Sequence, residues 1–161
     1  MIDPAKSPAT VLSAFLDAMA DLDPDRAIAF FADDGTFEFP YGLPGMPTRA
    51  TGRSSVMKLL RGMSMFDWIE LYDRCFYETD DPEVAVATFK SHAQVWGSPY
   101  ANTYVSLARV RDGHIVEYRE HFEPLALIGA LPAPRRLSLL AVLALPRKLR
   151  TRLFASRGFK K

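Results

Sequence analysis

Four stretches between residues 67 and 122 alternate apolar and polar side chains, and this alternation limits the possible fold more than any other feature. A period of two residues is typical of β-strands that bury one face. Short turn signals, "DDP", "GSP" and "DG", separate the stretches, and short turns force neighbouring strands to be antiparallel. The predicted strands are DWIELYDRCFYET, EVAVATFKSHAQVW, YANTYVSLARVR and HIVEYREHF. We therefore predict a four-stranded meander.

The N-terminal part of the chain has helical spacing instead. Ser7 and Asp23 each precede a proline, as an N-cap precedes the first helical residue, and we predict helices from each of these positions, the second ending at Gly35. "TFEF" is a short strand and "SSVMKLLRGM" a third helix. The predicted class is α+β, with N-terminal helices packed on one face of a curved, mainly antiparallel sheet.

The charges divide the chain into two parts. Residues 1–131 carry 11 Lys and Arg against 19 Asp and Glu, whereas residues 132–161 carry nine Lys and Arg and no acid. Such a split indicates two roles or two environments. We predict one acidic domain over 1–131 and a basic, amphipathic, helical C-terminal extension over 132–161.

Several classes of protein are disfavoured. The single cysteine, Cys75, excludes an internal disulfide framework and a paired-cysteine metal or redox site. Three scattered histidines lack metal-ligand spacing, so we predict no metal. The N-terminus lacks a signal-peptide pattern, and no run of about 18 apolar residues exists to span a membrane. We expect a cytoplasmic protein.

The last predicted strand places a carboxyl group on an apolar face. That face carries Val116, Tyr118, Glu120 and Phe122. The turn before this strand can form in two ways, and each places Glu120 opposite a different residue of the preceding strand. If "RDGH" forms a two-residue turn, Glu120 lies opposite Val105. If it forms a three-residue turn with a glycine bulge, Glu120 lies opposite Tyr104.

The preceding turn brings further polar groups to the same face. A three-residue loop at "GSP" pairs Trp96 with Tyr100 and sets His92 opposite Tyr104. In the bulged register one face then carries His92, Tyr104 and Glu120 on three adjacent strands, with Lys90, Gln94, Asn102 and Ser106 nearby. Convergent polar groups among aromatic walls are typical of a ligand pocket.

At this point the chain resembles a known family. "AIAFFADDGTFEFPYGLPGMP", "ATGRSSVMKLL", "SPYANTYVSLARVRDGHIVEYREHFEP" and the opening helix are similar to the SnoaL-like branch of the nuclear transport factor 2-like superfamily, over roughly residues 8–128. This branch has a cone-shaped α+β fold and includes polyketide cyclases, ketosteroid isomerases and limonene epoxide hydrolases, so the resemblance implies a cone-shaped fold here. "FEFPYGLPGMP" with "YREHFEP" resembles the phenazine-biosynthesis A and B proteins. The fold hosts many reactions and also non-enzymes.

The resemblance implies a role for one residue. Epoxide hydrolases of this branch carry an acidic Asp in a Trp-Arg-Asp-Tyr-Phe-Asp motif on the last strand, and the phenazine-type relatives carry a pocket glutamate there. The matching residue is Glu120, which favours the bulged register. The Arg-x-Asp pair of the epoxide hydrolases has no counterpart in "FKSHAQ", which disfavours epoxide hydrolysis. The resemblance also implies a homodimer.

These residues indicate acid/base chemistry. A glutamate walled by aromatic rings has a raised pKa and can exchange protons. We predict Glu120 as the acid/base, His92 as its partner and Tyr104 as a donor to a developing oxyanion. Contacts to the substrate are assigned to Phe39, Tyr100, Asn102, Tyr118 and Phe122. The predicted function is an isomerase, cyclase or lyase without cofactor or metal, acting on a small apolar or aromatic carbonyl compound.

Other interpretations stay open at this stage. Glu120 also fits a solvated position or an ion pair with Lys90, and His92 and the tyrosines fit structural roles. The whole domain also fits a non-catalytic binding module, or an interaction domain acting through its tail. For the tail we favour packing on the domain or on a dimer partner over contact with an anionic membrane. The apolar residues predicted to pack are Leu139, Leu140, Val142, Leu143 and Leu145. No recognition motif indicates nucleic-acid binding.

Overall fold

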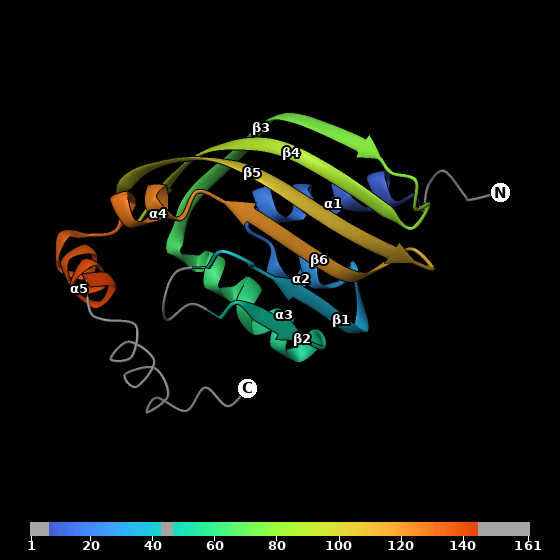
Figure 1. Cartoon of the computed structure of the whole chain (residues 1–161), viewed down its shortest axis with the longest axis horizontal. Coiled ribbons are helices and arrows are strands. Elements are labelled where there is room, and N and C mark those ends of the chain that lie inside the picture. The colour runs from blue at the N-terminus through green and yellow to red at the C-terminus, as the bar shows by residue number, and fades with distance from the viewer. Residues whose placement is uncertain (1–6, 43–46, 145–161) are drawn as a thin grey trace.

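The fold is built on one curved, unclosed sheet of six strands. A computed structural model describes residues 7–42 and 47–144. The strands follow the spatial order β2-β1-β6-β5-β4-β3, and the sheet bends over the helices (Figure 1). Their bounds are β1 Phe31–Glu38, β2 Arg49–Thr51, β3 Phe66–Glu78, β4 Val84–Val95, β5 Ser98–Arg111 and β6 His114–Phe122. The predicted α+β class and the meander β3 to β6 are confirmed.

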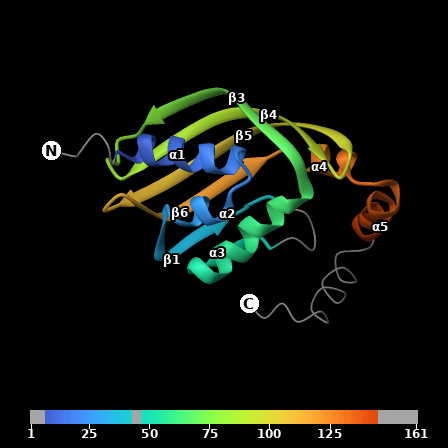
Figure 2. The same cartoon turned by 180° about the vertical axis from the view of Figure 1, so that it is seen from behind.

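The N-terminal helices cover the concave face of the sheet (Figure 2). They are α1 Pro8–Ala20, α2 Pro24–Ile28 and α3 Arg53–Leu60, which a 3-10 turn, η2 Arg61–Met65, connects to β3. The predicted caps are confirmed, because the side chains of Ser7 and Asp23 accept hydrogen bonds from the backbone N–H groups of Thr10 and Arg26.

Aromatic rings form the centre of the core. Phe15 of α1 is fully buried and meets Phe31, Phe37 and Tyr118 edge-on, with ring centroids 4.9 to 6.5 Å apart. Tyr118 in turn lies 4.7 Å from Phe37 of the neighbouring strand β1. Edge-to-face packing of this kind adds to the stability gained by burying the rings. The core therefore joins α1 to β1 and β6, and fixes the strand that carries Glu120.

The second helix is shorter than the sequence predicts. It ends at Ile28, and Phe31 already starts β1. β1 pairs in parallel with β6, with Phe31 opposite Ile115 and Phe37 opposite Tyr118. A Cβ atom on Gly35 would lie 2.8 Å from the carbonyl oxygen of Ile115, so glycine permits this close approach and does not end a helix. The short β2 strand was not predicted.

The predicted turn between β4 and β5 is wrong in both length and position. Val95 pairs with Ser98 across a two-residue turn, in which Trp96 and Gly97 both have positive φ, 47° and 79°. Two positive φ values are typical of a type I′ turn. The register therefore differs by three residues from the predicted one: His92 lies opposite Ala101 and not opposite Tyr104. A shift by an odd number of residues reverses the face of β4 relative to β5.

The turn between β5 and β6 combines features of both predicted geometries. Asp112 and Gly113 form a two-residue turn. A bulge then shifts the register between Arg109 and Val110, so that Glu120 lies opposite Ser106 and Phe122 opposite Tyr104. Glu120 thus lies on the predicted face, but its partner on β5 is Ser106, two residues after the predicted partner Tyr104.

Two helices follow the sheet. α4 Pro124–Ala130 packs its Leu127 and Ile128 against the sheet, and α5 Ala133–Ala144 lies beyond the end of β6 (Figure 1). Leu140 of α5 is 45% exposed to solvent, and its predicted packing on the domain or on a dimer partner stays a prediction. The side chains of Leu139, Val142, Leu143 and Leu145 lie outside the described residues. The domain boundary at 131/132 stays a prediction.

No helix formed by residues 7–42 and 47–144 has both the length and the apolar character needed to cross a bilayer.

Candidate functional site

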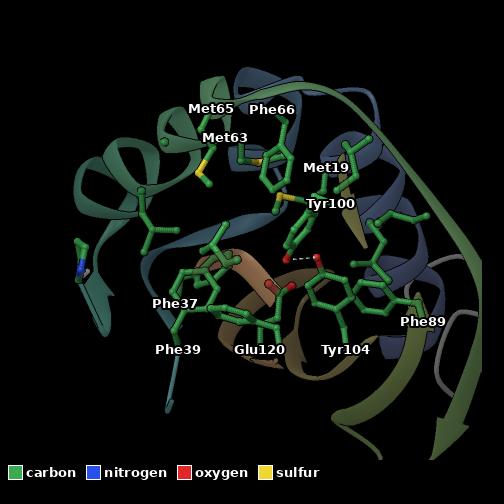
Figure 3. Close-up of a pocket in the computed structure, with 18 of the residues that line it drawn as sticks. Met19, Phe37, Phe39, Met63, Met65, Phe66, Phe89, Tyr100, Tyr104 and Glu120 are labelled. Atoms are coloured by element: carbon green, nitrogen blue, oxygen red, sulfur yellow. Dashed lines mark hydrogen bonds between the residues drawn. The ribbon is translucent and has the colours of Figure 1, made fainter. Parts of the chain in front are cut away.

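The concave face and the helices enclose one apolar cavity of about 390 Å³ (Figure 3). Aromatic and methionine side chains form most of its wall, and Glu120 contributes its carboxyl group. The full lining is Leu16, Met19, Phe37, Phe39, Pro47, Lys58, Leu59, Gly62, Met63, Met65, Phe66, Ile69, Leu71, Phe89, Tyr100, Tyr104, Glu120, Phe122 and Leu127. A mostly apolar cavity with few polar groups is typical of a small-molecule site.

Glu120 is buried and carries no counter-charge. It is 8% exposed, and among the described residues no ion pair reaches its carboxyl group. Burial raises its pKa from 4.5 to about 7, and the Tyr118 hydroxyl, which donates a hydrogen bond of 2.6 Å to the carboxylate, lowers the pKa in part. Near neutral pH the group therefore exists in both the protonated and the ionised form.

Two tyrosine hydroxyls lie beside this carboxyl group. Figure 3 shows the hydroxyls of Tyr100 and Tyr104 and the carboxyl group of Glu120 directed toward the same part of the cavity. The two hydroxyl oxygens are 3.0 Å apart, and that of Tyr104 lies 3.2 Å from the hydroxyl of Ser91. Desolvation raises the pKa of both tyrosines. Both therefore stay protonated and act as hydrogen-bond donors.

Asn102 fixes the position of the Tyr100 hydroxyl through a network of hydrogen bonds. Its Nδ2 group donates to the Tyr100 hydroxyl at 2.7 Å and to the carbonyl oxygen of Glu123 at 2.9 Å, and its Oδ1 accepts from the N–H groups of Thr103 and Glu123. Both amide hydrogens are thus in use. The structure does not support the predicted substrate contact of Asn102, and makes it a positioning residue for Tyr100.

The structure removes His92 from the predicted site. Because the β4–β5 register differs by three residues from the predicted one, His92 lies on the outer face of the sheet. It is exposed there, and its Nε2 atom is 3.1 Å from the Tyr72 hydroxyl. Lys90 shares that face and pairs with Asp73 at 2.7 Å. The predicted juxtaposition of His92 with Tyr104 and Glu120 is therefore wrong, and so is the alternative ion pair of Glu120 with Lys90.

Of the other predicted substrate-binding residues, three line the cavity and one lies behind its wall. Phe39, Tyr100 and Phe122 line the cavity. Tyr118 is fully buried behind Glu120 and contacts its carboxylate and the core rings, so it supports Glu120 and does not form the wall.

Sequence reasoning missed much of the wall. Phe89 stacks on Tyr104 with ring centroids 4.7 Å apart, and the correct strand register would have placed it there. Met19, Met63, Met65 and Leu127 come from helices and the 3-10 turn, whose docking the strand pattern does not specify, and Phe66 is the first residue of β3.

Within the part of the chain that the structure describes, no three His, Cys, Asp or Glu side chains gather as metal ligands do.

Comparison with known proteins identifies the family. A family model described as a SnoaL-like domain matches residues 12–118. The chain belongs to the SnoaL-like family. This SnoaL-like chain is also 38% identical, over 103 residues, to an uncharacterised PhzA/B-like protein of Pseudomonas aeruginosa, a match that covers 63% of the chain and 73% of the relative.

Solved structures confirm the fold of the SnoaL-like chain. A Bacillus subtilis protein provisionally assigned as an isomerase superposes with a TM-score of 0.73 at 24% identity, over 80% of this chain and 95% of that one. A Xanthomonas campestris protein provisionally assigned as a polyketide cyclase gives 0.63 at 22% identity, over 74% and 93%. At these identities the structural comparisons establish the fold alone. The match to the family model confirms the predicted resemblance to SnoaL-like proteins.

Proposed function

We propose that the protein is an isomerase, cyclase or lyase that moves a proton on an apolar, carbonyl-bearing molecule by means of Glu120. The observation that carries this proposal is a buried carboxyl group, without a counter-charge, at an apolar cavity, with a pKa raised to about 7. A group whose pKa lies near the working pH is suited both to accept and to return a proton. The SnoaL-like family membership and its cyclase-like and isomerase-like structural neighbours support the same class.

The first step would be removal of a proton from the carbon next to the carbonyl group. Ionised Glu120 takes the proton, and the electron pair of the broken C–H bond moves toward the carbonyl oxygen as an enolate. The hydroxyls of Tyr100 and Tyr104 lie beside the carboxyl group and can donate to that oxygen. Their raised pKa values keep the donated protons on the tyrosines.

The second step returns the proton. Glu120, now protonated, gives the proton to another carbon of the enolate in an isomerisation, or to a leaving oxygen in an elimination. The apolar wall disfavours water in the cavity, which strengthens the hydrogen bonds to the enolate oxygen and so lowers the barrier to proton transfer. Glu120 ends ionised as it began, so the cycle needs no external acid or base.

Exchange of substrate hydrogens tests this proposal directly. Cyclic and aromatic ketones that bind to the protein are incubated in D₂O, and NMR follows the loss of protons next to the carbonyl group. Glu120→Gln should abolish catalysed exchange, with a loss of about 10² to 10⁴ in rate, and leave binding intact. Tyr104→Phe should lower the rate by about 10². Glu70→Gln, an exposed carboxylate on the outer face, is the matched control.

A non-catalytic binding module is the second candidate. The position of His92 favours this candidate, because His92 lies outside the cavity and cannot exchange a proton with Glu120 there. Besides Glu120, the described titratable groups that line the cavity are Lys58, Tyr100 and Tyr104. Ligands that bind with no exchange in wild type, and equally well to Glu120→Gln, would establish this second function in place of the first.

A further inference from the structure

Three of the residues that line the cavity are also exposed to solvent, and they locate its mouth. They are Pro47, Lys58 and Gly62, whereas every other lining residue is buried or half-buried. A Cβ atom on Gly62 would meet no atom of the other described segments within 4 Å, so the space beside this residue is open. The cavity therefore opens to water beside the end of α3 and the 3-10 turn that follows it.

The mouth carries a positive charge, and the carboxyl group lies across the cavity from it. Lys58 and Glu120 are the two charged side chains among the described lining residues. The lining residues of α3 and the 3-10 turn recur at helical spacing, so they form one stripe of this segment. They are Lys58, Leu59, Gly62 and Met63. Figure 3 shows Met63 on the opposite side of the cavity from Glu120.

The Lys58 ammonium group is available to a ligand. Of the two lysines that the structure describes, Lys90 pairs with Asp73 at 2.7 Å, whereas Lys58 has no hydrogen-bond or ion-pair partner among the described side chains. Lys58 lies in the last turn of α3, where the partial negative charge of the helix end favours a cation. That role leaves the three N–H donors of the ammonium group free to bind an anion.

We propose that the substrate of this cavity carries a carboxylate besides its carbonyl group, and that Lys58 binds this carboxylate at the mouth. The inference rests on the proposed function, which places the carbonyl group at Tyr100 and Tyr104. The two charges then fix the direction in which a keto acid enters. Its carboxylate stays at the mouth, in contact with Lys58 and water, and its apolar part carries the carbonyl group toward Glu120. The reverse direction would bury two carboxyl groups side by side, which is costly.

A singly charged carboxylate fits this mouth better than a phosphate. Phosphate sites in proteins commonly use arginine pairs or the N–H groups at a helix N-terminus. Here the C-terminal end of α3, with its partial negative charge, is next to the mouth, and Lys58 is the one cation among the described lining residues. One ammonium group balances one carboxylate.

Two matched ligands test the inference by binding alone. The probes are para-acetylbenzoate and its methyl ester, which share an aromatic ketone and differ by one negative charge. Titration calorimetry with the full chain measures both dissociation constants. We expect Lys58→Met to weaken binding of the acid about three- to fivefold, as for an exposed ion pair, and to leave binding of the ester unchanged. High salt should weaken binding of the acid to wild type but not to this variant.

The same substitution on the outer face is the matched control. Lys90→Met should leave both dissociation constants unchanged, because Lys90 lies outside the cavity. Equal losses for the acid and the ester in Lys58→Met, or an acid that binds this variant as tightly as wild type, would overturn the inference. So would borohydride trapping of the ketone on Lys58, seen as a mass increase, because the amine would then bond to the carbonyl carbon.

Deuterium exchange separates the failure of this inference from the failure of the proposed function. Exchange of the methyl ester that depends on Glu120, with no effect of Lys58→Met on binding of the acid, would refute the carboxylate site and leave the proposed function intact. Binding of the acid that depends on Lys58, with no exchange of either ligand, would support the carboxylate site and refute proton transfer by Glu120.

Discussion

Replacing Glu120 with glutamine should make the protein more stable, and the gain should depend on pH in a defined way. The carboxyl group is buried, and its pKa rises from 4.5 to about 7 on folding. Each unit of pKa corresponds to about 1.4 kcal/mol, so the ionised carboxylate costs the folded state about 3 kcal/mol. Glutamine removes this cost, and its side-chain oxygen can still accept the hydrogen bond from Tyr118.

The sign of the pH dependence follows from the protonation states. Below pH 4.5 the carboxyl group is protonated in both the folded and the unfolded chain, so it makes no electrostatic difference. Between pH 4.5 and about 7 only the unfolded chain is ionised, and the stability of wild type falls as pH rises. Above that range both states are ionised and the penalty stays constant.

Thermal unfolding of wild type and Glu120→Gln from pH 5 to pH 8 measures this difference. The gain should grow from roughly 1 kcal/mol at pH 5 to about 3 kcal/mol at pH 8, which corresponds to roughly 6 to 12 °C in melting temperature for a chain of this size. Glu70→Gln, an exposed carboxylate, should show no gain. A gap that is equal at both pH values would refute the reasoning, because it would mean that Glu120 is solvated.

Three further substitutions test other parts of the structure. Tyr118→Phe removes the hydrogen bond that lowers the pKa of Glu120, so the pH midpoint of the stability loss should move upward, with a further cost of about 1–3 kcal/mol above pH 7. Gly35→Ala forces a Cβ atom against the carbonyl oxygen of Ile115 and should destabilise the protein by about 1–3 kcal/mol in chemical denaturation. His92→Ala should leave ketone exchange unchanged, because the side chain lies on the outer face; a large loss of exchange would restore His92 to the site.

The sequence predicts the strands well because their alternation is a local signal. The face of Glu120 follows from that alternation, and the cavity lining includes Phe39, Tyr100, Tyr104 and Phe122. The N-terminal caps are equally local, since a capping side chain and the proline after it act within one turn.

The register across the turns could not be predicted in the same way. Trp96 adopts a positive φ of 47°, which a bulky residue rarely does, so the sequence favours a longer loop than the one that forms. The resulting register error of three residues, an odd number, placed His92 on the wrong face in the prediction. The bulge between Arg109 and Val110 likewise lacks a glycine to mark it.

A local sequence pattern also cannot predict which distant segments pair in the sheet. Phe31 has helical spacing from Ile28, yet it joins β6 through Ile115 and starts a strand. Tertiary pairing overrides local preference in such a segment.

The parallel pairing of β1 with β6 has a consequence for the order of folding. Thr36 of β1 hydrogen-bonds to Val116 of β6, 80 residues later in the chain, whereas β4, β5 and β6 are joined to one another by two-residue turns. Contacts between distant residues form late, because closing a long loop costs entropy before any contact repays it. During synthesis, β1 is made early and cannot pair with β6 until β6 has been synthesised. Phe37 and Glu120 therefore meet only after most of the chain has left the ribosome, and the cavity is completed in the last stage of folding.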